Sequence, residues 1–219
     1  MLAAQLRTEP LRPDTEVLDL CTGSGLLAVT AALSGAGRVV AADASRAALL
    51  SAWLNARLNG VRVVPRHGDL FAAVAGERFD LIVSNPPYLP GPDPTLPRRG
   101  PARAWEGGRN GRLFLDRICD DVRRHLRPGG ALLLLHSSVC GTSETLGRLG
   151  RHGLEAGVVF THRGPLGPVL RTRADWLRGQ GVLADGDCEE VVIIRARRPT
   201  TPAPGGAPGS APESRLAAG

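Results

Sequence analysis

The segment Asn85-Pro86-Pro87-Tyr88 is the part of this sequence best suited to chemistry. It follows an apolar run, Phe79–Ser84, which is typical of a buried strand. Two prolines after an asparagine end such a strand and stiffen the chain. The corner presents a polar side chain, an unpaired backbone carbonyl and an aromatic face together. This combination predicts a site that holds a planar NH2 group, and therefore chemistry on an amide or amino nitrogen.

A glycine-containing turn, Cys21–Gly25, separates an expected strand, Val17–Leu20, from an expected helix, Leu26–Leu33. Glycines let a ligand approach the backbone, and a helix N-terminus offers free N–H groups. The dinucleotide pattern G-x-G-x-x-G is not met, since position 28 is Ala and position 21 is Cys. Taken alone, the turn fits a nucleotide site or a plain connection between strand and helix.

Two further acids follow expected strands. Asp43 ends the strand Val39–Asp43, where a carboxylate can accept both hydroxyls of a ribose. Asp69 follows the expected strand Val61–Val64 and precedes Leu70. Its carboxylate could accept the exocyclic amine of an adenine while Leu70 packs on the ring. Each acid alone also fits a loop residue or a helix cap.

The series is more informative than its members. Asp19, Asp43, Asp69 and Asn85 lie at the carboxyl ends of four successive expected strands. Ligands of open α/β sheets bind at this edge. The four residues therefore predict one site rather than four unrelated features.

The elements needed to hold this site alternate along the chain. Beyond those named, the sequence predicts the following: a helix from an N-cap at Ser45 to Leu58, a polar loop over 90–108, a helix over 112–126, a turn over 127–130, a strand over 131–135, a helix over 143–151, and strands at 158–160 and 191–194. Strands alternating with helices imply an α/β fold with a mainly parallel sheet covered on both faces.

Size and composition narrow the class of protein. The chain has 219 residues, of which 42% are hydrophobic, so one domain is expected. It has no apolar run near the roughly 20 residues that cross a bilayer and no signal-peptide pattern, so we expect a cytoplasmic protein without a membrane partner. The four cysteines lack metal-ligand spacing, and no metal is expected. A net charge of +6 leaves a nucleic-acid partner open, although every basic residue is a dispersed arginine.

The motifs together resemble class I S-adenosylmethionine-dependent methyltransferases with an NPPY motif. The stretch Trp105–Arg112 narrows the likeness to HemK-type protein-glutamine N5-methyltransferases, in the short branch that modifies class-1 release factors. The resemblance covers about Val17 to Arg195. It implies a Rossmann-like, seven-stranded sheet whose last strands form a hairpin. The domains expected are a remnant of an N-terminal helix at 1–16, a methyltransferase domain at 17–198 and a disordered tail at 199–219.

The resemblance also implies roles for residues. Asn85 and the Pro86 carbonyl would accept hydrogen bonds from the target NH2, and Tyr88 would pack on the flat acceptor. The residues expected to act in catalysis are Asn85, Pro86, Pro87 and Tyr88. Those expected to bind S-adenosylmethionine are Asp19, Cys21, Thr22, Gly23, Gly25, Asp43, Ala44, Asp69, Leu70 and Asn85.

The resemblance implies a release-factor-like protein substrate and leaves room for a small activator subunit. Two alternatives remain open at this point. The acceptor could be a nucleic-acid base, such as the N6 of adenine, or a small molecule. The chain could also be a non-catalytic module that only binds the cofactor. In one departure from the family pattern, Cys21 stands where many relatives carry glycine.

Overall fold

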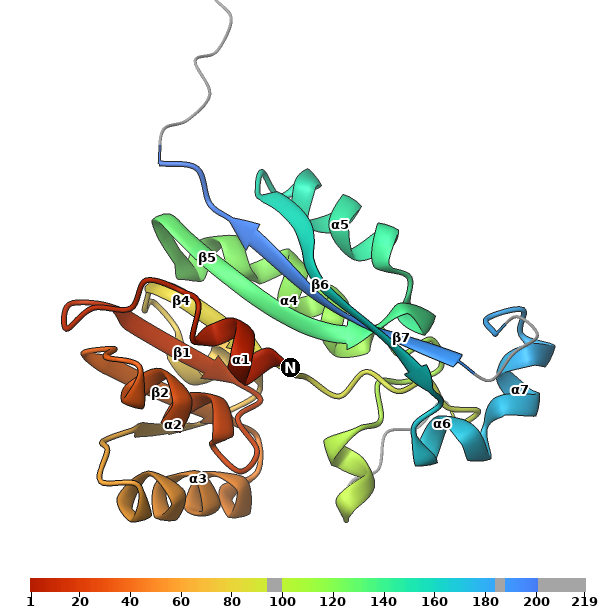
Figure 1. Ribbon diagram of the computed structural model, residues 1–219, viewed down its shortest axis with the longest axis horizontal. Coiled ribbons are helices and arrows are strands. Elements are labelled where there is room, and N and C mark those ends of the chain that lie inside the picture. Colours follow the sequence, from red (N-terminus) through yellow and green to blue (C-terminus); the bar gives the residue numbers. More distant parts are fainter. Residues whose placement is uncertain (94–99, 184–187, 201–219) are drawn as a thin grey trace, which may run out of the picture.

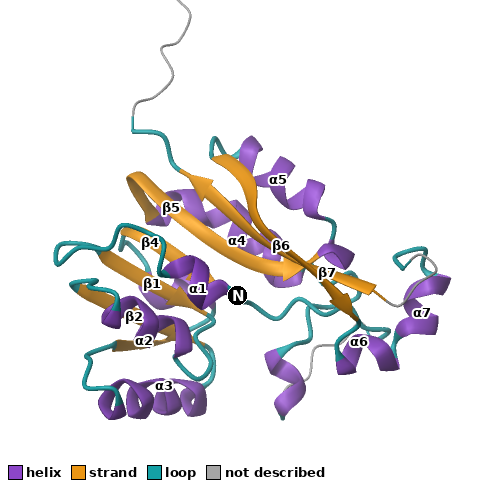
Figure 2. Ribbon diagram, viewed as in Figure 1, coloured by secondary structure: helices purple, strands orange, loops and turns teal. Residues whose placement is uncertain are grey.

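The structure, a computed structural model, describes residues 1–93, 100–183 and 188–200. Seven strands form one sheet in the order β3-β2-β1-β4-β5-β7-β6 (Figures 1 and 2). The strands are β1 Glu16–Leu20, β2 Arg38–Asp43, β3 Val64–His67, β4 Phe79–Ser84, β5 Leu126–Ser137, β6 Glu155–Pro165 and β7 Cys188–Arg197. The first five are parallel, and β7 pairs antiparallel with both β5 and β6. The predicted seven-stranded α/β fold with a terminal hairpin is therefore confirmed.

Helices cover both faces of the sheet (Figure 2). The α-helices are α1 Leu2–Leu6, α2 Leu26–Leu33, α3 Arg46–Leu58, α4 Leu113–His125, α5 Thr142–Arg151, α6 Pro168–Thr172 and α7 Ala174–Gly179. Short 3-10 helices lie at η1 Leu70–Val74, η2 Pro101–Ala104 and η3 Ser138–Cys140. None of the helices in the described part of the chain is long and apolar enough to cross a membrane.

Alternation of side chains along the strands builds two cores. Leu18 and Leu20 of β1 face the core formed with η1, α4 and α5, whereas Val17 faces the core formed with α1, α2 and α3. Successive side chains of a strand point to opposite faces, so a run of apolar residues in a central strand fills both layers. This explains why the central strands read as continuous apolar runs in the sequence.

Two predicted elements are misplaced, and the strands expected at 131–135, 158–160 and 191–194 are longer in the structure. The third strand was expected at Val61–Val64 but begins only at Val64, which pairs with Val40, and it includes Pro65. Proline is tolerated there because β3 is an edge strand that needs few ladder donors. The predicted turn at 127–130 lies instead within β5, where the chain departs from the β4 register and the backbone of Gly129 and Gly130 pairs with Arg198.

Candidate active site

A cavity of about 1090 Å³ opens at the carboxyl ends of the parallel strands. Its wall comes from the turn after β1, the end of β2, the start of α3, the segment before η1 and the corner after β4. Met1, Leu2 and Ala3 of the N-terminal segment, and Phe114 and Arg117 of α4, also line the cavity. The edge of the sheet predicted from the four strand-end residues is thus where the cavity lies.

The turn after β1 brings backbone to the cavity surface. Cys21 has a φ of 61° and Gly23 a φ of 56°, both in the left-handed region. Residues other than glycine are strained in this region. The surrounding structure must therefore hold the backbone of Cys21 in this conformation. A Cβ on Gly23 would meet nothing within 4 Å, because the space beside it is the cavity. Cys21, Thr22 and Gly23 line the cavity wall.

Asp43 ties this turn to the next strand. One carboxylate oxygen accepts the Gly23 N–H at 3.0 Å, and the other accepts the Ser45 N–H at 2.8 Å. Each carboxylate oxygen can accept a second hydrogen bond. Asp43 lines the cavity together with Ala44, so it can position the glycine turn and still accept two hydroxyls from a ligand.

Asp69 and Leu70 form the next part of the wall. Leu70 has a φ of 49°, which is strained for a branched apolar side chain, and its side chain is 7% exposed. Asp69 is paired with Arg117 of α4, with 2.6 Å between Nη2 and Oδ2. This pair links the sheet edge to the helix across from it. No pattern in the sequence predicts Arg117 as the partner of Asp69.

Asp19 and Gly25 lie behind the wall rather than on it. Asp19 is fully buried, and its Oδ2 accepts hydrogen bonds from the Thr22 hydroxyl at 2.6 Å and the Ala28 N–H at 2.9 Å. Burial raises the pKa of Asp19 to about 7. A Cβ on Gly25 would come within 2.7 Å of Ala52, so this glycine allows α2 to approach α3 closely. Neither residue is placed in the cavity surface, and both hold the glycine turn from behind.

The Asn85–Tyr88 corner divides in the same way. Asn85 and Pro87 line the cavity, whereas Pro86 and Tyr88 are not part of its surface. Asn85 is exposed, and within the described ranges its side chain has no hydrogen-bond partner in the protein. The Tyr88 ring packs against the cores on both faces of the sheet, and its carbonyl accepts the Cys140 thiol at 3.0 Å. Tyr88 therefore anchors the corner, and Asn85 is the group presented to a ligand.

The Trp105–Arg112 segment packs directly on this corner. The Leu89 N–H donates to the Trp105 carbonyl at 2.8 Å, and the Gly107 N–H donates to the Leu89 carbonyl at 2.9 Å. A Cβ on Gly107 would come within 2.8 Å of the Tyr88 backbone, and a Cβ on Gly111 within 2.2 Å of the Tyr88 carbonyl oxygen. These two glycines are thus required by a close approach of two backbones.

Arg112 ends the segment as a buried cation, with 3% of its side chain exposed. It donates to Asp116 at 2.7 Å and to the carbonyls of Cys140 and Gly141. These bonds join the start of α4 to the η3–α5 connection. The segment that narrowed the resemblance therefore supports the Asn85 corner from outside, rather than supplying a free reactive group.

Comparison with known proteins identifies the family. Residues 1–96 match the family described as "Methyltransferase small domain". A Methanocaldococcus jannaschii protein assigned to the protein N5-glutamine methyltransferases is 37% identical over 134 residues, which are 61% of this chain and 68% of that relative. The chain belongs to the protein-glutamine N5-methyltransferase family.

Bacterial and eukaryotic relatives agree with this membership. The Xylella fastidiosa release factor glutamine methyltransferase is 43% identical over 129 residues, which are 56% of this chain and 47% of that enzyme. The chain thus spans about half the length of such relatives. A solved structure of the E. cuniculi Mtq2–Trm112 complex, responsible for methylation of the eRF1 translation termination factor, superposes with a TM-score of 0.60 at 26% identity. The superposition covers 90% of this chain and 92% of the matched chain of that complex.

The cavity of this glutamine methyltransferase family member fits the family's cofactor, S-adenosylmethionine. The glycine turn leaves open space beside its backbone, Asp43 keeps spare acceptor capacity, and Leu70 offers an apolar surface next to Asp69. Within the described residues neither Asp43 on the wall nor Asp19 behind it forms an ion pair, which suits a ligand that carries positive charge. Burial also raises the pKa of the Cys21 thiol, with further contributions from Asp43 and Asp19, so the thiol stays neutral beside them.

Several residues of the cavity wall were not among the site residues predicted from the sequence. Ser45 and Ala48 line the cavity from the first turn of α3, and their position after Asp43 could have indicated this. Arg103 and Glu106 reach the cavity from the loop over 90–108, of which 94–99 lie outside the described residues. Glu106 belongs to the Trp105–Arg112 segment that carried the resemblance, but no pattern marked it as a residue of the site, and none separated Arg103 from its neighbours. His136, which follows the apolar strand, is buried and outside the cavity wall.

Proposed function

We propose that this protein transfers a methyl group from S-adenosylmethionine to the side-chain amide nitrogen of a glutamine in a protein of the translation machinery. A class-1 release factor is the favoured substrate. The proposal rests on the position of Asn85, whose amide is exposed on the cavity wall. Its corner is held by the hydrogen bond from Cys140 and by the backbone bonds to the Trp105–Arg112 segment. Relatives named for release factors and for ribosomal protein uL3 support a protein acceptor.

The reaction has a simple balance. When bound, S-adenosylmethionine supplies a methyl group on a positively charged sulfur. The carbon–sulfur bond breaks as the new carbon–nitrogen bond forms, the sulfur keeps the electron pair of the broken bond, and the amide nitrogen loses one proton to solvent. An amide nitrogen is a weak nucleophile because its lone pair is delocalised. The protein must therefore lower the barrier chiefly by alignment and by acceptors for the N–H groups.

Asn85 is suited to both tasks. Its side-chain oxygen can accept a hydrogen bond from the substrate NH2, which turns the nitrogen toward the cofactor end of the cavity. Holding two reactants in line can lower a barrier by ~7–11 kcal/mol in favourable cases. An acceptor already fixed where positive charge develops requires no reorganisation during the reaction. Pro87 stiffens the corner, and the partly buried Tyr88, packed against both cores, holds it in place.

The other end of the cavity would hold the cofactor. Asp43 would accept hydrogen bonds from the ribose, and Asp69 with Leu70 would hold the adenine. The glycine turn would lie along the amino-acid end, with Asp19 acting through Thr22 and the start of α2. This division places the acceptor at the Asn85 corner and the donor between the ends of β1 and β2.

The partner assignments are also part of the proposal. The E. cuniculi relative Mtq2 is found in a complex with Trm112, and we propose that this chain, too, accepts a small activator subunit. A cytoplasmic location follows from the proposed substrate, because release factors act on ribosomes there.

Labelled-methyl transfer tests the proposal. The purified chain would be incubated with labelled S-adenosylmethionine and, separately, the class-1 release factor of the source organism, its DNA and its ribosomal RNA. We expect label in the release factor, and loss of label when the acceptor glutamine is changed to alanine. Label in DNA or RNA without label in protein would replace the glutamine assignment with base methylation. Absence of S-adenosylmethionine binding by calorimetry would reject any methyltransferase activity of this chain.

A further inference from the structure

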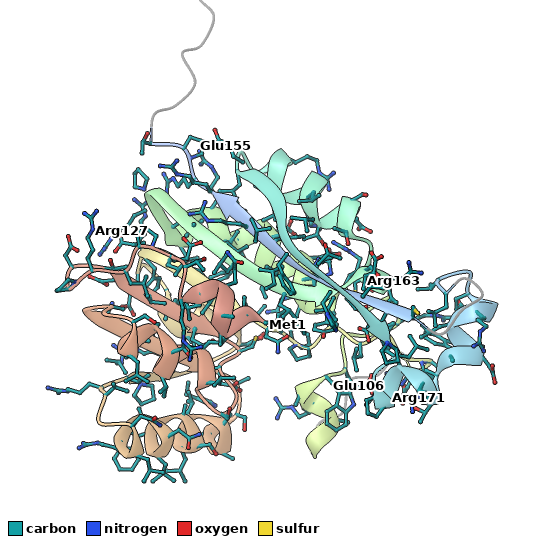
Figure 3. All side chains as sticks on the ribbon, in the orientation of Figure 1. Met1, Glu106, Arg127, Glu155, Arg163 and Arg171 are labelled. Atoms are coloured by element: carbon teal, nitrogen blue, oxygen red, sulfur yellow. The ribbon has the colours of Figure 1, made fainter. Side chains whose placement is uncertain are left out.

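A partly buried ion pair joins the cavity wall to a helical unit that was not predicted from the sequence. Helices α6 and α7, joined at Arg173 and here called the α6–α7 unit (168–179), connect β6 to the chain that returns to β7. Glu106, a residue of the cavity wall, lies beside α6 in Figure 3. Its carboxylate is paired with the Arg173 guanidinium, and the two side chains are 15% and 18% exposed.

The α6–α7 unit has its own small core. Leu166, Leu170, Ala174 and Leu177 are buried together, and Leu89, one residue beyond Tyr88, packs against them. This core fixes the direction in which Arg173 projects. Through Leu89, it also attaches the unit to the chain that leaves the Asn85 corner.

Arg173 contacts both segments that form the acceptor end of the cavity. Its Nη1 donates to the Pro90 carbonyl at 2.8 Å and to Glu106 Oε2 at 3.2 Å, and its Nη2 donates to Glu106 Oε1. Leu89 and Glu106 also meet in a parallel backbone bridge. One guanidinium thus holds the loop that carries Glu106 and the segment that follows Tyr88 at a fixed spacing.

The geometry argues against Glu106 as a base. Both of its carboxylate oxygens accept hydrogen bonds from a guanidinium that is itself mostly buried. A charge-assisted, bidentate pair of this kind is strong and directional. Because both oxygens are already bonded to Arg173, the Glu106 carboxylate holds the neighbouring segments in place rather than removing a proton from the substrate.

We propose that Arg173 is a positioning residue for the methyl acceptor, and that the α6–α7 unit acts through it to fix the acceptor end of the cavity. This inference rests on the proposed function and deepens it. It assigns to Arg173 and Glu106 an effect on binding of the glutamine substrate, and no effect on binding of the cofactor. The pair of Arg195 with Glu9 offers a control, because it is also bidentate, at 2.8 and 3.0 Å, but neither residue lies on the cavity wall.

The experiment compares Arg173→Met, Glu106→Gln and the double variant with Arg195→Met. Each is assayed with the release factor as acceptor, and its dissociation constant for S-adenosylmethionine is measured separately. We expect Arg173→Met to raise the KM for the acceptor about tenfold, the size of a moderate coupling between contacting groups. We expect kcat and cofactor affinity to change less than about threefold on the same scale. Arg173→Lys should recover part of the loss, and Arg195→Met should leave KM unchanged.

Other outcomes would overturn the inference. A fall in kcat with unchanged KM would mean a structural role for the pair, and a fall in kcat for Glu106→Gln with a displaced pH profile would mean that Glu106 is a base. An equal rise in KM for Arg195→Met would show that any lost ion pair has this effect.

Hydrogen exchange makes the test independent of the substrate. In Arg173→Met, but not in Arg195→Met, the Leu89 and Gly107 amides should lose protection, because their partners span the two segments that Arg173 holds. Unchanged protection would contradict the positioning role. If the wild-type chain does not methylate glutamine, the proposed function fails, and this exchange measurement still decides whether Arg173 fixes the wall.

Discussion

Strand β1 has one acid at its start and another near its end, and their surroundings differ. At its start, Glu16 pairs with Arg38 at 2.7 Å and with Arg127 at 2.9 Å, and Arg127 continues to Asp80 at 2.7 Å. Near its end, Asp19 is fully buried with no cation beside it, and one of its oxygens has no partner within the described residues. The two ends of one five-residue strand therefore differ in how charge is neutralised.

The pKa values follow this difference. Burial raises the pKa of Glu16, but hydrogen bonds from Arg127 and Arg38 outweigh it, and the pKa is lowered overall. Burial dominates at Asp19 and raises its pKa to about 7. The amino-terminal end of the sheet is thus closed by ion pairs that stabilise the fold. The carboxyl-terminal end keeps acids and the amide of Asn85 available for a ligand, at a cost in stability.

The largest effect is expected from Asn85→Ala. If Asn85 aligns the acceptor, kcat should fall by roughly 10²–10³, as when one preorganised group of a catalytic site is removed. The dissociation constant for S-adenosylmethionine should stay within about twofold on the affinity scale. Steady-state kinetics and calorimetry measure the two quantities. Loss of cofactor binding together with activity would show that Asn85 serves the donor rather than the acceptor.

Asp19→Asn should change stability in a pH-dependent way. The folded carboxyl, with a pKa of about 7, holds its proton over a range where the unfolded carboxyl has lost it, so wild-type stability falls as the pH rises from about 4 to 7. Asparagine has no such charge. Measured by urea unfolding without cofactor, the variant should gain on the order of 3 kcal/mol relative to wild type between pH 4 and 8. A constant difference across this range would contradict a buried, uncompensated Asp19.

Asp43→Ala tests the difference between the carboxyl-terminal end of the sheet, which carries the cavity, and the amino-terminal end, which carries the ion pairs. It removes an acceptor from the cavity and leaves the Gly23 and Ser45 N–H groups unpaired. Cofactor affinity should fall about 10- to 100-fold. The matched control is Asp80→Ala, because Asp80 also accepts a backbone N–H, from Glu16 at 2.8 Å, but at the amino-terminal end. Titration calorimetry should find nearly wild-type affinity for that control, and equal losses in both would remove the distinction between the two ends.

The smallest effect is expected from Glu16→Gln. The side chains of this network are about a third exposed, so solvent screening limits its worth to about 1 kcal/mol at pH 7. Because the folded pKa of Glu16 is lowered, its stabilisation is complete above its unfolded pKa. The difference from wild type should therefore disappear as the pH falls through the folded pKa. Thermal unfolding at several pH values measures this, and methyl transfer per folded molecule should not change.

Much of this architecture could be predicted from the sequence, for a definite reason. The central strands are buried on both faces, so they appear as apolar runs, and the residues that follow them meet at one edge. Asp43, Asp69 and Asn85 could be found in this way. Asp19 and Tyr88 belong to the same motifs but lie behind the wall. A motif indicates that a residue matters, but it does not predict which surface its side chain faces.

The remaining parts depend on contacts between distant segments. Arg117 reaches Asp69 across 48 positions, and Arg173 reaches Glu106 across 67. Neither arginine differs in its local sequence from the dispersed arginines around it. The α6–α7 unit was also missed, since its two helices have only five and six residues and carry too little periodicity to recognise.

Tandem mass spectrometry of the methylated release factor tests the central claim most directly. The factor would be treated with S-adenosylmethionine and either the wild-type chain, Asn85→Ala or Glu16→Gln. The account predicts one additional methyl group on the amide nitrogen of a single glutamine with the wild type and Glu16→Gln, and none with Asn85→Ala. A methyl group on a lysine or a carboxylate, or equal modification by Asn85→Ala, would contradict it.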